Sequence, residues 1–195
     1  MPHIYLASAS PRRKELMEQL GLSFTVLIPD VDERVEEYVP PGRLVEILSE
    51  RKAREAARGL DRGLIIGSDT VVVWRGRVMG KPLDRREALD MLECLQGDKH
   101  SVYSGLAVIN AGTGDFHVSH EKTGVSFRPA ARDELESYVD SGEPLDKAGA
   151  YAVQGLGAVF VTGIEGCYFN VVGLPLARLA GVLKDFGVDV LRRSF

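Results

Sequence analysis

"IYLASASPRRKELMEQLGLSFTVLIP" (residues 4–29) places two short apolar segments on either side of a helix-like segment. Ser10 is a favoured N-cap residue, and Pro11 suits the first helical turn. We therefore expect a strand, a helix over 11–20 and a second strand over 24–29. Strands and helices that alternate at the start of a chain are typical of α/β proteins.

The first turn of this predicted helix carries Arg12, Arg13 and Lys14. A helix begins at its positive end, where each cation costs roughly 0.3–1 kcal/mol. A bound phosphate would offset this cost, because helix N-termini and arginine side chains both bind phosphate oxygens. The alternative is an ordinary capped helix with solvated cations.

The rest of the chain extends the α/β pattern. Helical periodicity predicts further helices over 43–60, 84–97, 131–142 and 175–187. Apolar and alternating runs predict strands over 64–76 (a strand pair or a bent strand, broken at 67–70), 77–83, 99–110, 115–129 and 157–166. Because hairpins follow the early alternation, we expect an α/β fold: a mixed twisted sheet flanked by helices, in one domain over 1–195.

Composition excludes several classes of protein. The net charge of -4 gives no general attraction to nucleic acid or to an anionic membrane. No run reaches ~18 apolar residues, and no leader precedes the first strand, so we expect no membrane span. Cys94 and Cys167 lie far apart and fit neither a zinc motif nor a disulfide framework, which favours the reducing cytoplasm.

Two short motifs carry charged residues between apolar segments. Asp69 in "GSDT" (67–70) could lie at a strand end, bind a metal or act as a base; the alternative is a turn aspartate. Lys81 in "MGKP" (79–82) suits a phosphate ligand, although a solvated turn lysine is the simpler interpretation.

Three further segments add polar candidates. "SGEPLDKAGAYAVQG" (141–155) contains Asp146, Lys147 and Gln154, and the Gln154 amide could bind a base edge. Its small residues permit close approach to a ligand, whereas a long structured loop is the alternative. Glu33 lies in an acidic loop over 30–42, a segment that is usually solvated, and Lys52 lies on the helix predicted over 43–60.

Common nucleotide and hydrolase motifs are missing from the sequence. It contains no phosphate-binding P-loop, no dinucleotide-binding glycine motif after a strand, and no nucleophile elbow. His100, His117 and His120 follow no metal-binding pattern, and His117 and His120 would point to opposite faces of a strand.

Taken together, these motifs resemble the Maf family of nucleotide pyrophosphatases. The matching segments run in family order through nearly the whole chain: "LASASPRR" (6–13), "GSDTVV" (67–72), "GKP" (80–82), "HSVYSGLAV" (100–108), "SGEPLDKAGAYAVQG" (141–155) and "GCYFNVVGLPL" (166–176). The resemblance implies two lobes with a central cleft, as in the inosine triphosphate pyrophosphatases. It also implies hydrolysis of a nucleoside triphosphate to the monophosphate and pyrophosphate.

The resemblance also implies roles for individual residues. The "DKAGAY…QG" version of the fifth segment is similar to the branch that acts on dTTP and UTP. The family's proton acceptor then falls on Asp69, and its specificity-linked positions fall on Arg12, Thr70 and Gln154. Its other polar positions fall on Ser8, Arg13, Glu33, Lys52, Lys81, Asp146 and Lys147. Ser68 and Phe169 depart from the usual alanine and serine, and we expect neither to touch the chemistry directly.

The expected mechanism is attack of water at the α-phosphorus with help from a divalent metal. Asp69, with Glu33, would bind Mg²⁺ or Mn²⁺ and orient the water, and Asp69 could act as base or as metal ligand. Two alternatives remain: a pyrophosphatase for 7-methyl-GTP or another modified nucleotide, and a nucleotide-binding regulator of cell division. The family further suggests a homodimer, while the cysteines and the net charge favour a cytoplasmic protein with no nucleic-acid polymer or membrane as partner.

Overall fold

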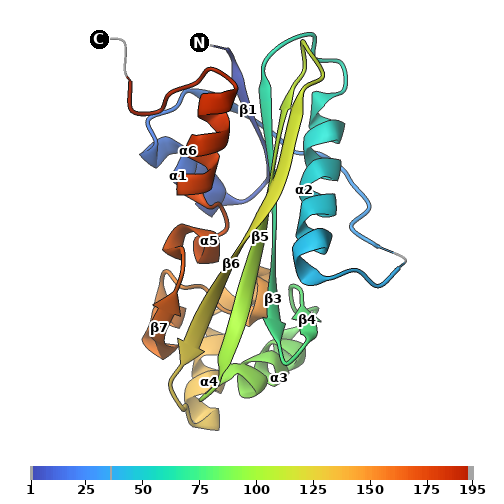
Figure 1. Ribbon diagram of the computed structural model, residues 1–195. Helices are drawn as coiled ribbons and strands as arrows, with labels where there is room; N and C mark the ends of the chain where they lie inside the picture. The colour runs from blue at the N-terminus through green and yellow to red at the C-terminus, as the bar shows by residue number, and fades with distance from the viewer. Residues whose placement is uncertain (1, 36, 193–195) are drawn as a thin grey trace. The chain divides into compact units, whose positions relative to one another are not determined.

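The computed structural model describes residues 2–35 and 37–192 (Figure 1). Glu36 of the predicted acidic loop, and residues 1 and 193–195 of the predicted domain, lie outside the described residues. The chain divides into two compact units. The first unit contains the chain up to Asp69, Ser104–Glu121 and the chain from Gly173 onward, and the second contains Thr70–Tyr103 and Lys122–Val172.

A seven-stranded mixed sheet has the order β2-β1-β3-β5-β6-β7, with β4 paired to β3 off this path. Its strands are β1 (Ile4–Ala7), β2 (Phe24–Leu27), β3 (Leu64–Trp74), β4 (Arg77–Met79), β5 (Lys99–Asn110), β6 (Phe116–Phe127) and β7 (Val161–Glu165). β1 is parallel to both β2 and β3, whereas β3–β4 and β6–β7 are antiparallel. The predicted mixed α/β fold is therefore confirmed.

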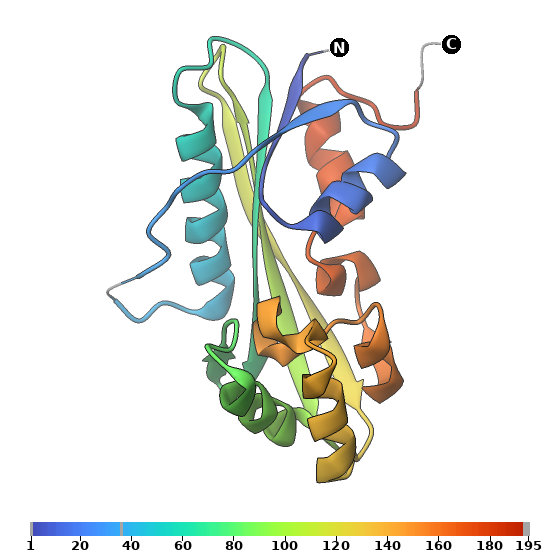
Figure 2. The ribbon, with the colours of Figure 1, turned by 180° about the vertical axis from the view of Figure 1, so that it is seen from behind.

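In the first unit, helices cover both faces of the parallel strands. α1 (Pro11–Gln19) connects β1 to β2, and α2 (Pro41–Ala57) connects β2 to β3 on the other side of β1. Right-handed crossovers in opposite directions place their helices on opposite faces of a sheet. Figures 1 and 2 show this arrangement, with α6 (Leu176–Asp185) beside α1.

The core beneath α2 is formed by small and branched side chains. Ala7, Ala53, Ile65, Ala107 and Ile109 form a cluster that is at most 5% exposed. The alanines let the helix lie close to the strands, because a helix approaches a sheet only as far as the facing side chains allow.

The second unit contains helices α3 (Arg85–Leu95), α4 (Arg132–Asp140) and α5 (Tyr168–Val172) and three short 3₁₀ helices, η1 (Glu143–Asp146), η2 (Ala148–Ala150) and η3 (Leu156–Phe160). Asp84 caps the start of α3, because its Oδ1 accepts a hydrogen bond from Glu87 N at 2.8 Å. No helix within residues 2–35 and 37–192 has both the length and the apolar character that crossing a membrane requires.

Several predicted boundaries are wrong. The run over 64–76 is one strand that continues through "GSDT", so Asp69 is not a turn residue. The segment over 157–166 begins as η3 and becomes a strand only at Val161. α2 begins at Pro41 rather than at residue 43, and α5 was not predicted.

Candidate functional site

In the first unit, the candidate residues gather where the parallel pairing of β1 with β2 and β3 ends. The β1–β3 register ends at Ala7 and Gly67, and Ser8 and Asp69 lie just beyond it. Glu33 lies in the segment that follows β2. The strand order reverses at β1, since the chain passes first to β2 and then to β3 on the other side. Ligands of open α/β sheets bind at such a position.

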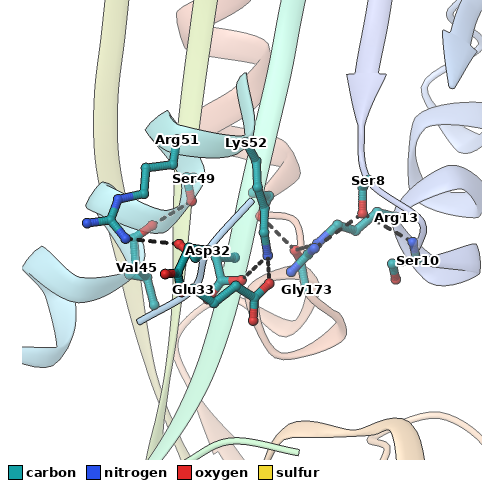
Figure 3. Close-up of polar contacts among 12 residues, drawn as sticks. Ser8, Ser10, Arg13, Asp32, Glu33, Val45, Ser49, Arg51, Lys52 and Gly173 are labelled. Carbon is teal, nitrogen blue, oxygen red and sulfur yellow. Dashed lines mark hydrogen bonds and ion pairs between the residues drawn. The ribbon is translucent and has the colours of Figure 1, made fainter. Parts of the chain in front are cut away.

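Lys52 joins the two carboxylates of this region (Figure 3). Its Nζ lies 2.5 Å from Asp69 Oδ1 and 2.7 Å from Glu33 Oε1. The Lys52 and Asp69 side chains are only 14% and 12% exposed, whereas the Glu33 side chain is 61% exposed. The Lys52–Asp69 pair is therefore shielded from solvent, while Glu33 reaches it from the outside.

The backbone explains why Lys52 and Asp69 meet. Gly67 and Asp69 share a face of β3, because side chains alternate along a strand. A Cβ atom at Gly67 would lie 2.3 Å from Ser49 O and 2.9 Å from the Ala53 Cβ, so α2 packs directly on the backbone of this face. Lys52 lies on the same turns of α2, and its side chain reaches along the strand to Asp69.

Arg13 is fixed from the opposite face of β3 (Figure 3). Its Nε donates to Gly173 O at 2.8 Å, and its Nη1 donates to Ser8 Oγ at 3.3 Å. Ser68 Oγ donates to the same Gly173 carbonyl at 3.0 Å. Ser68 therefore shares an acceptor with Arg13, and the expectation that it does not touch the chemistry directly stays a prediction.

The Arg13 guanidinium interacts electrostatically with Asp69 and Glu33, the carboxylates that Lys52 binds. Burial lowers the pKa of the Arg13 guanidinium, and the Asp69 carboxylate is the strongest influence that raises it. Arg12 also lowers this pKa, and Glu33 raises it. Lys14 is different: it forms an exposed i,i+4 ion pair with Glu18 at 3.6 Å.

In the second unit, a backbone contact brings two predicted lysine motifs together. Gly149 N donates to Gly80 O at 2.9 Å, which joins the turn before Lys81 to the turn after Lys147. Lys147 forms an ion pair with the exposed Asp146 carboxylate. These three predicted residues therefore belong to one local cluster.

Gly149 also fixes this cluster against β3. Its φ is +68°, and a Cβ atom there would lie 2.8 Å from Val72 Cγ2. Thr70 shares the face of Val72 by strand alternation. Thr70 and Gln154 are both half-buried. The structure thus places Ser8, Arg12, Arg13, Glu33, Lys52 and Asp69 in the first unit and Thr70, Lys81, Asp146, Lys147 and Gln154 in the second.

The carboxylates of this region are few for a metal site. Within the part of the chain that the structure describes, no three His, Cys, Asp or Glu side chains are grouped to hold an ion. Asp69 and Glu33 nevertheless converge on one cation, the Lys52 ammonium. Mg²⁺ is commonly bound by one or two carboxylates together with substrate phosphates. The two carboxylates fit that mode, and they do not form a cage made of protein ligands alone.

The chain belongs to the Maf family, since the model of the Maf-like protein family matches residues 3–186. It is 53% identical to a dTTP/UTP pyrophosphatase of Desulforamulus reducens, over 98% of this chain and all of that protein. It is 54% identical to a dTTP/UTP pyrophosphatase of Pelotomaculum thermopropionicum over the same shares. Among solved structures, a HAM1 protein from Coxiella burnetii matches 95% of this chain and 100% of that chain, with 20% identity and a TM-score of 0.49.

Proposed function

We propose that this protein hydrolyses dTTP and UTP to the monophosphate and pyrophosphate. The observation that carries the proposal is the Asp69–Lys52–Glu33 cluster, which lies beside Arg13 where the parallel pairing of β1 with β2 and β3 ends. A carboxylate and several cations in one place suit water attack on a phosphate ester. The names of its full-length relatives support the choice of substrate.

The cations bind the triphosphate in this proposal. Arg12, Arg13 and the start of α1 hold phosphate oxygens, because guanidinium groups and helix N-termini both suit them. Lys52 stabilises the charge that develops on the leaving pyrophosphate. In the second unit, Lys81 and Lys147 are further cations suited to phosphate, and Asp146 pairs with Lys147.

Asp69 accepts the proton of the attacking water. The water oxygen forms a bond to the α-phosphorus, the bond from that phosphorus to the bridging oxygen breaks, and pyrophosphate leaves with the electron pair. In the free protein, Asp69 Oδ1 is bound by Lys52. Transfer of the Lys52 ammonium to the substrate's phosphates would release Oδ1 for the water.

Asp69 and Glu33 would hold a divalent cation, Mg²⁺ or Mn²⁺, together with the phosphates of the substrate. When bound, such an ion makes its water more acidic and offsets phosphate charge. Asp69 then serves as ligand, as base, or as both, and Glu33 completes the carboxylate pair from the segment after β2.

The base is bound in the second unit. Gln154 offers one donor and one acceptor to the O4/N3 edge that thymine and uracil share. Thr70 lies on the face of β3 against which the segment containing Gly149 packs, and we assign it to the same specificity site. Ser8 supports Arg13 through the hydrogen bond to its Oγ.

A nucleotide panel tests this proposal. Release of pyrophosphate from dTTP, UTP, CTP, GTP and 7-methyl-GTP is measured with titrated Mg²⁺ and Mn²⁺. The expected result is metal-dependent release from dTTP and UTP above all others. Equal or faster release from 7-methyl-GTP would show that the substrate assignment is wrong. Saturable binding without any release would instead indicate a nucleotide-binding regulator of cell division.

We further propose that both compact units act as one Maf domain and that the protein is a cytoplasmic homodimer. Light scattering coupled to size-exclusion chromatography measures the mass in solution. A mass near twice the chain's 21.3 kDa is expected, and a monomer at micromolar concentration would contradict the dimer.

A further inference from the structure

The turn that contains Gln154 is held on both sides by one pair of side chains. Tyr138 of α4 donates its hydroxyl proton to Glu143 Oε1 at 2.8 Å, and the same hydroxyl accepts from Ala152 N at 3.2 Å. Ala152 lies two residues before Gln154. Tyr138 is 5% exposed, so this contact is shielded from water. Figure 2 shows the segment after α4, in orange, returning beside that helix.

Glu143 fixes the other side of the turn. Its Oε2 accepts from Leu156 N at 2.9 Å, and its Oε1 accepts from Gly157 N at 3.0 Å. Hydrogen bonds from backbone N–H groups to a carboxylate are charge-assisted and stronger than bonds between neutral groups. Residues 152–157 are thus bound at three backbone N–H groups, with Gln154 between them.

The glycines of the turn let the carboxylate and the hydroxyl approach this closely. Gly155 has a φ of +79°, and a Cβ atom there would lie 2.4 Å from Glu143 Oε2. A Cβ atom at Gly157 would lie 2.5 Å from the Tyr138 hydroxyl oxygen. Both distances are shorter than ordinary contacts, so a side chain at either position would clash with Glu143 or Tyr138. Glycine at 155 and 157 therefore permits the hydrogen bonds that the Tyr138–Glu143 pair makes to the turn.

This matters for base selection because a glutamine amide can rotate by half a turn. In one orientation it suits the O4/N3 edge of uracil, and in the other it suits the N4/N3 edge of cytosine. Backbone N–H and C=O groups cannot exchange roles in this way. Discrimination between the two bases therefore depends on backbone groups held at fixed positions around Gln154.

We propose that Tyr138 and Glu143 are positioning residues that determine the preference for dTTP and UTP over CTP. This inference rests on the proposed function, in which Gln154 binds the pyrimidine edge. Neither side chain needs to touch the nucleotide. Their effect passes through the backbone on either side of Gln154.

The test compares the ratio of kcat/KM for dTTP to that for CTP in four variants. Tyr138→Phe removes the hydroxyl and keeps the ring, which packs on Phe160 with centroids 5.3 Å apart. Glu143→Gln keeps the shape and removes the charge. Gln154→Ala removes the amide, and Ser137→Ala is the control, because the Ser137 hydroxyl bonds to Asp133 O within α4.

We expect Tyr138→Phe and Glu143→Gln each to lower the ratio at least fivefold, mainly through a higher KM for dTTP, and Ser137→Ala to leave it unchanged. In a Gln154→Ala background, Tyr138→Phe should still lower the ratio, because the backbone N–H groups that Tyr138 and Glu143 hold are unchanged by loss of the Gln154 amide. An equal fall in turnover of both nucleotides, or an unchanged ratio in a folded Glu143→Gln protein, would refute the inference.

The wild-type protein distinguishes failure of the proposed function from failure of this inference. A wild-type protein that releases no pyrophosphate from any nucleotide contradicts the proposed activity before any variant is made. A wild-type protein that hydrolyses dTTP and CTP equally contradicts both the role of Gln154 and this inference. A selective wild-type protein whose variants stay selective contradicts the inference alone.

Discussion

Replacing Asp69 by asparagine tests the proposed catalytic role of its carboxylate separately from its contribution to stability. Asp69 is 8% exposed, and its Oδ1 lies 2.5 Å from Lys52 Nζ. Asparagine keeps the size and an oxygen that can accept from Lys52, but it cannot accept the proton of water. Removal of a general base typically costs about 10²–10⁴ in rate. We expect dTTP turnover to fall by a factor of that size, about 3–5 kcal/mol of transition-state stabilisation.

Asp69→Asn should lower the free energy of unfolding by less than it lowers transition-state stabilisation. Lys52 keeps Glu33 at 2.7 Å, so its ammonium retains a carboxylate partner. Loss of one charged hydrogen bond then lowers the free energy of unfolding by about 1–3 kcal/mol. Lys52→Met should cost more, about 3–5 kcal/mol, because it removes a mostly buried positive charge from Asp69. Lys52→Met should therefore be the less stable variant, because it leaves Asp69 without its cation, whereas Asp69→Asn leaves Lys52 with the Glu33 carboxylate.

The assay pairs pyrophosphate release from dTTP with urea unfolding. Asp61→Asn is the control, since Asp61 is an exposed aspartate shortly before β3. We expect Asp69→Asn to unfold cooperatively at a moderately lower urea concentration while turnover is nearly lost. Turnover at the parent rate would remove Asp69 from the mechanism. A Lys52→Met protein as stable as Asp69→Asn would refute the ranking of the ion pairs.

Three further predictions concern other parts of the chain. Arg13→Lys removes a side chain that bonds to two acceptors, so kcat/KM for dTTP should fall at least tenfold, whereas Lys14→Gln on the same turn should change it less than twofold. Burial lowers the pKa of His100 to about 4. Between pH 7 and pH 5 the unfolded chain therefore takes up more protons than the folded protein, and the free energy of unfolding should drop by about 2 kcal/mol through this residue. Urea unfolding of His100→Gln should lack this part of the pH dependence. The same pH dependence in His100→Gln as in the parent protein would contradict the prediction. In Gly149→Ala, the new Cβ atom meets Val72 and the backbone keeps a φ of +68°, so the free energy of unfolding should fall by about 2–4 kcal/mol. Adding Val72→Ala should relieve the steric clash but not the backbone strain, so it should restore only part of this loss.

Capping and periodicity predicted most helices within a few residues, because those signals are local. The continuity of β3 through "GSDT" was missed because it depends on strand pairing that no local pattern shows. β1 pairs with β3 only as far as Gly67, yet β3 continues to Trp74 with β4 paired from Val72 onward. The 3₁₀ helix at 156–160 was missed for a similar reason, since the Glu143 carboxylate holds its first N–H groups.

For the site as well, the sequence indicated individual residues, but the contacts between residues far apart in the chain required the structure. Asp69 stood out in the sequence by its place between apolar segments, but only the resemblance to a family joined it with Lys52 in one site, because a helix residue and a strand residue 17 positions apart share no local motif. Ser68 and Gly173 were missed as supports of Arg13, since they lie 105 residues apart and meet only through a backbone carbonyl. Tyr138 and Glu143 left a signal in the sequence, the glycines at 155 and 157, but their contact with those glycines required the fold.

The structure also changes the argument about cations at the start of α1. The sequence suggested that a bound phosphate is needed to offset their cost at the positive end of the helix. In the free protein, the Asp69 and Glu33 carboxylates already favour the charged form of Arg13, and Lys14 pairs with Glu18. Arg13 and Lys14 therefore each have carboxylates nearby without any ligand, although burial still lowers the pKa of Arg13. A bound triphosphate, with about four negative charges, would compete with the two carboxylates for Arg12, Arg13 and Lys52. The carboxylates would then face phosphate without their cationic partners, and the divalent cation proposed above would let both groups of anions share the site.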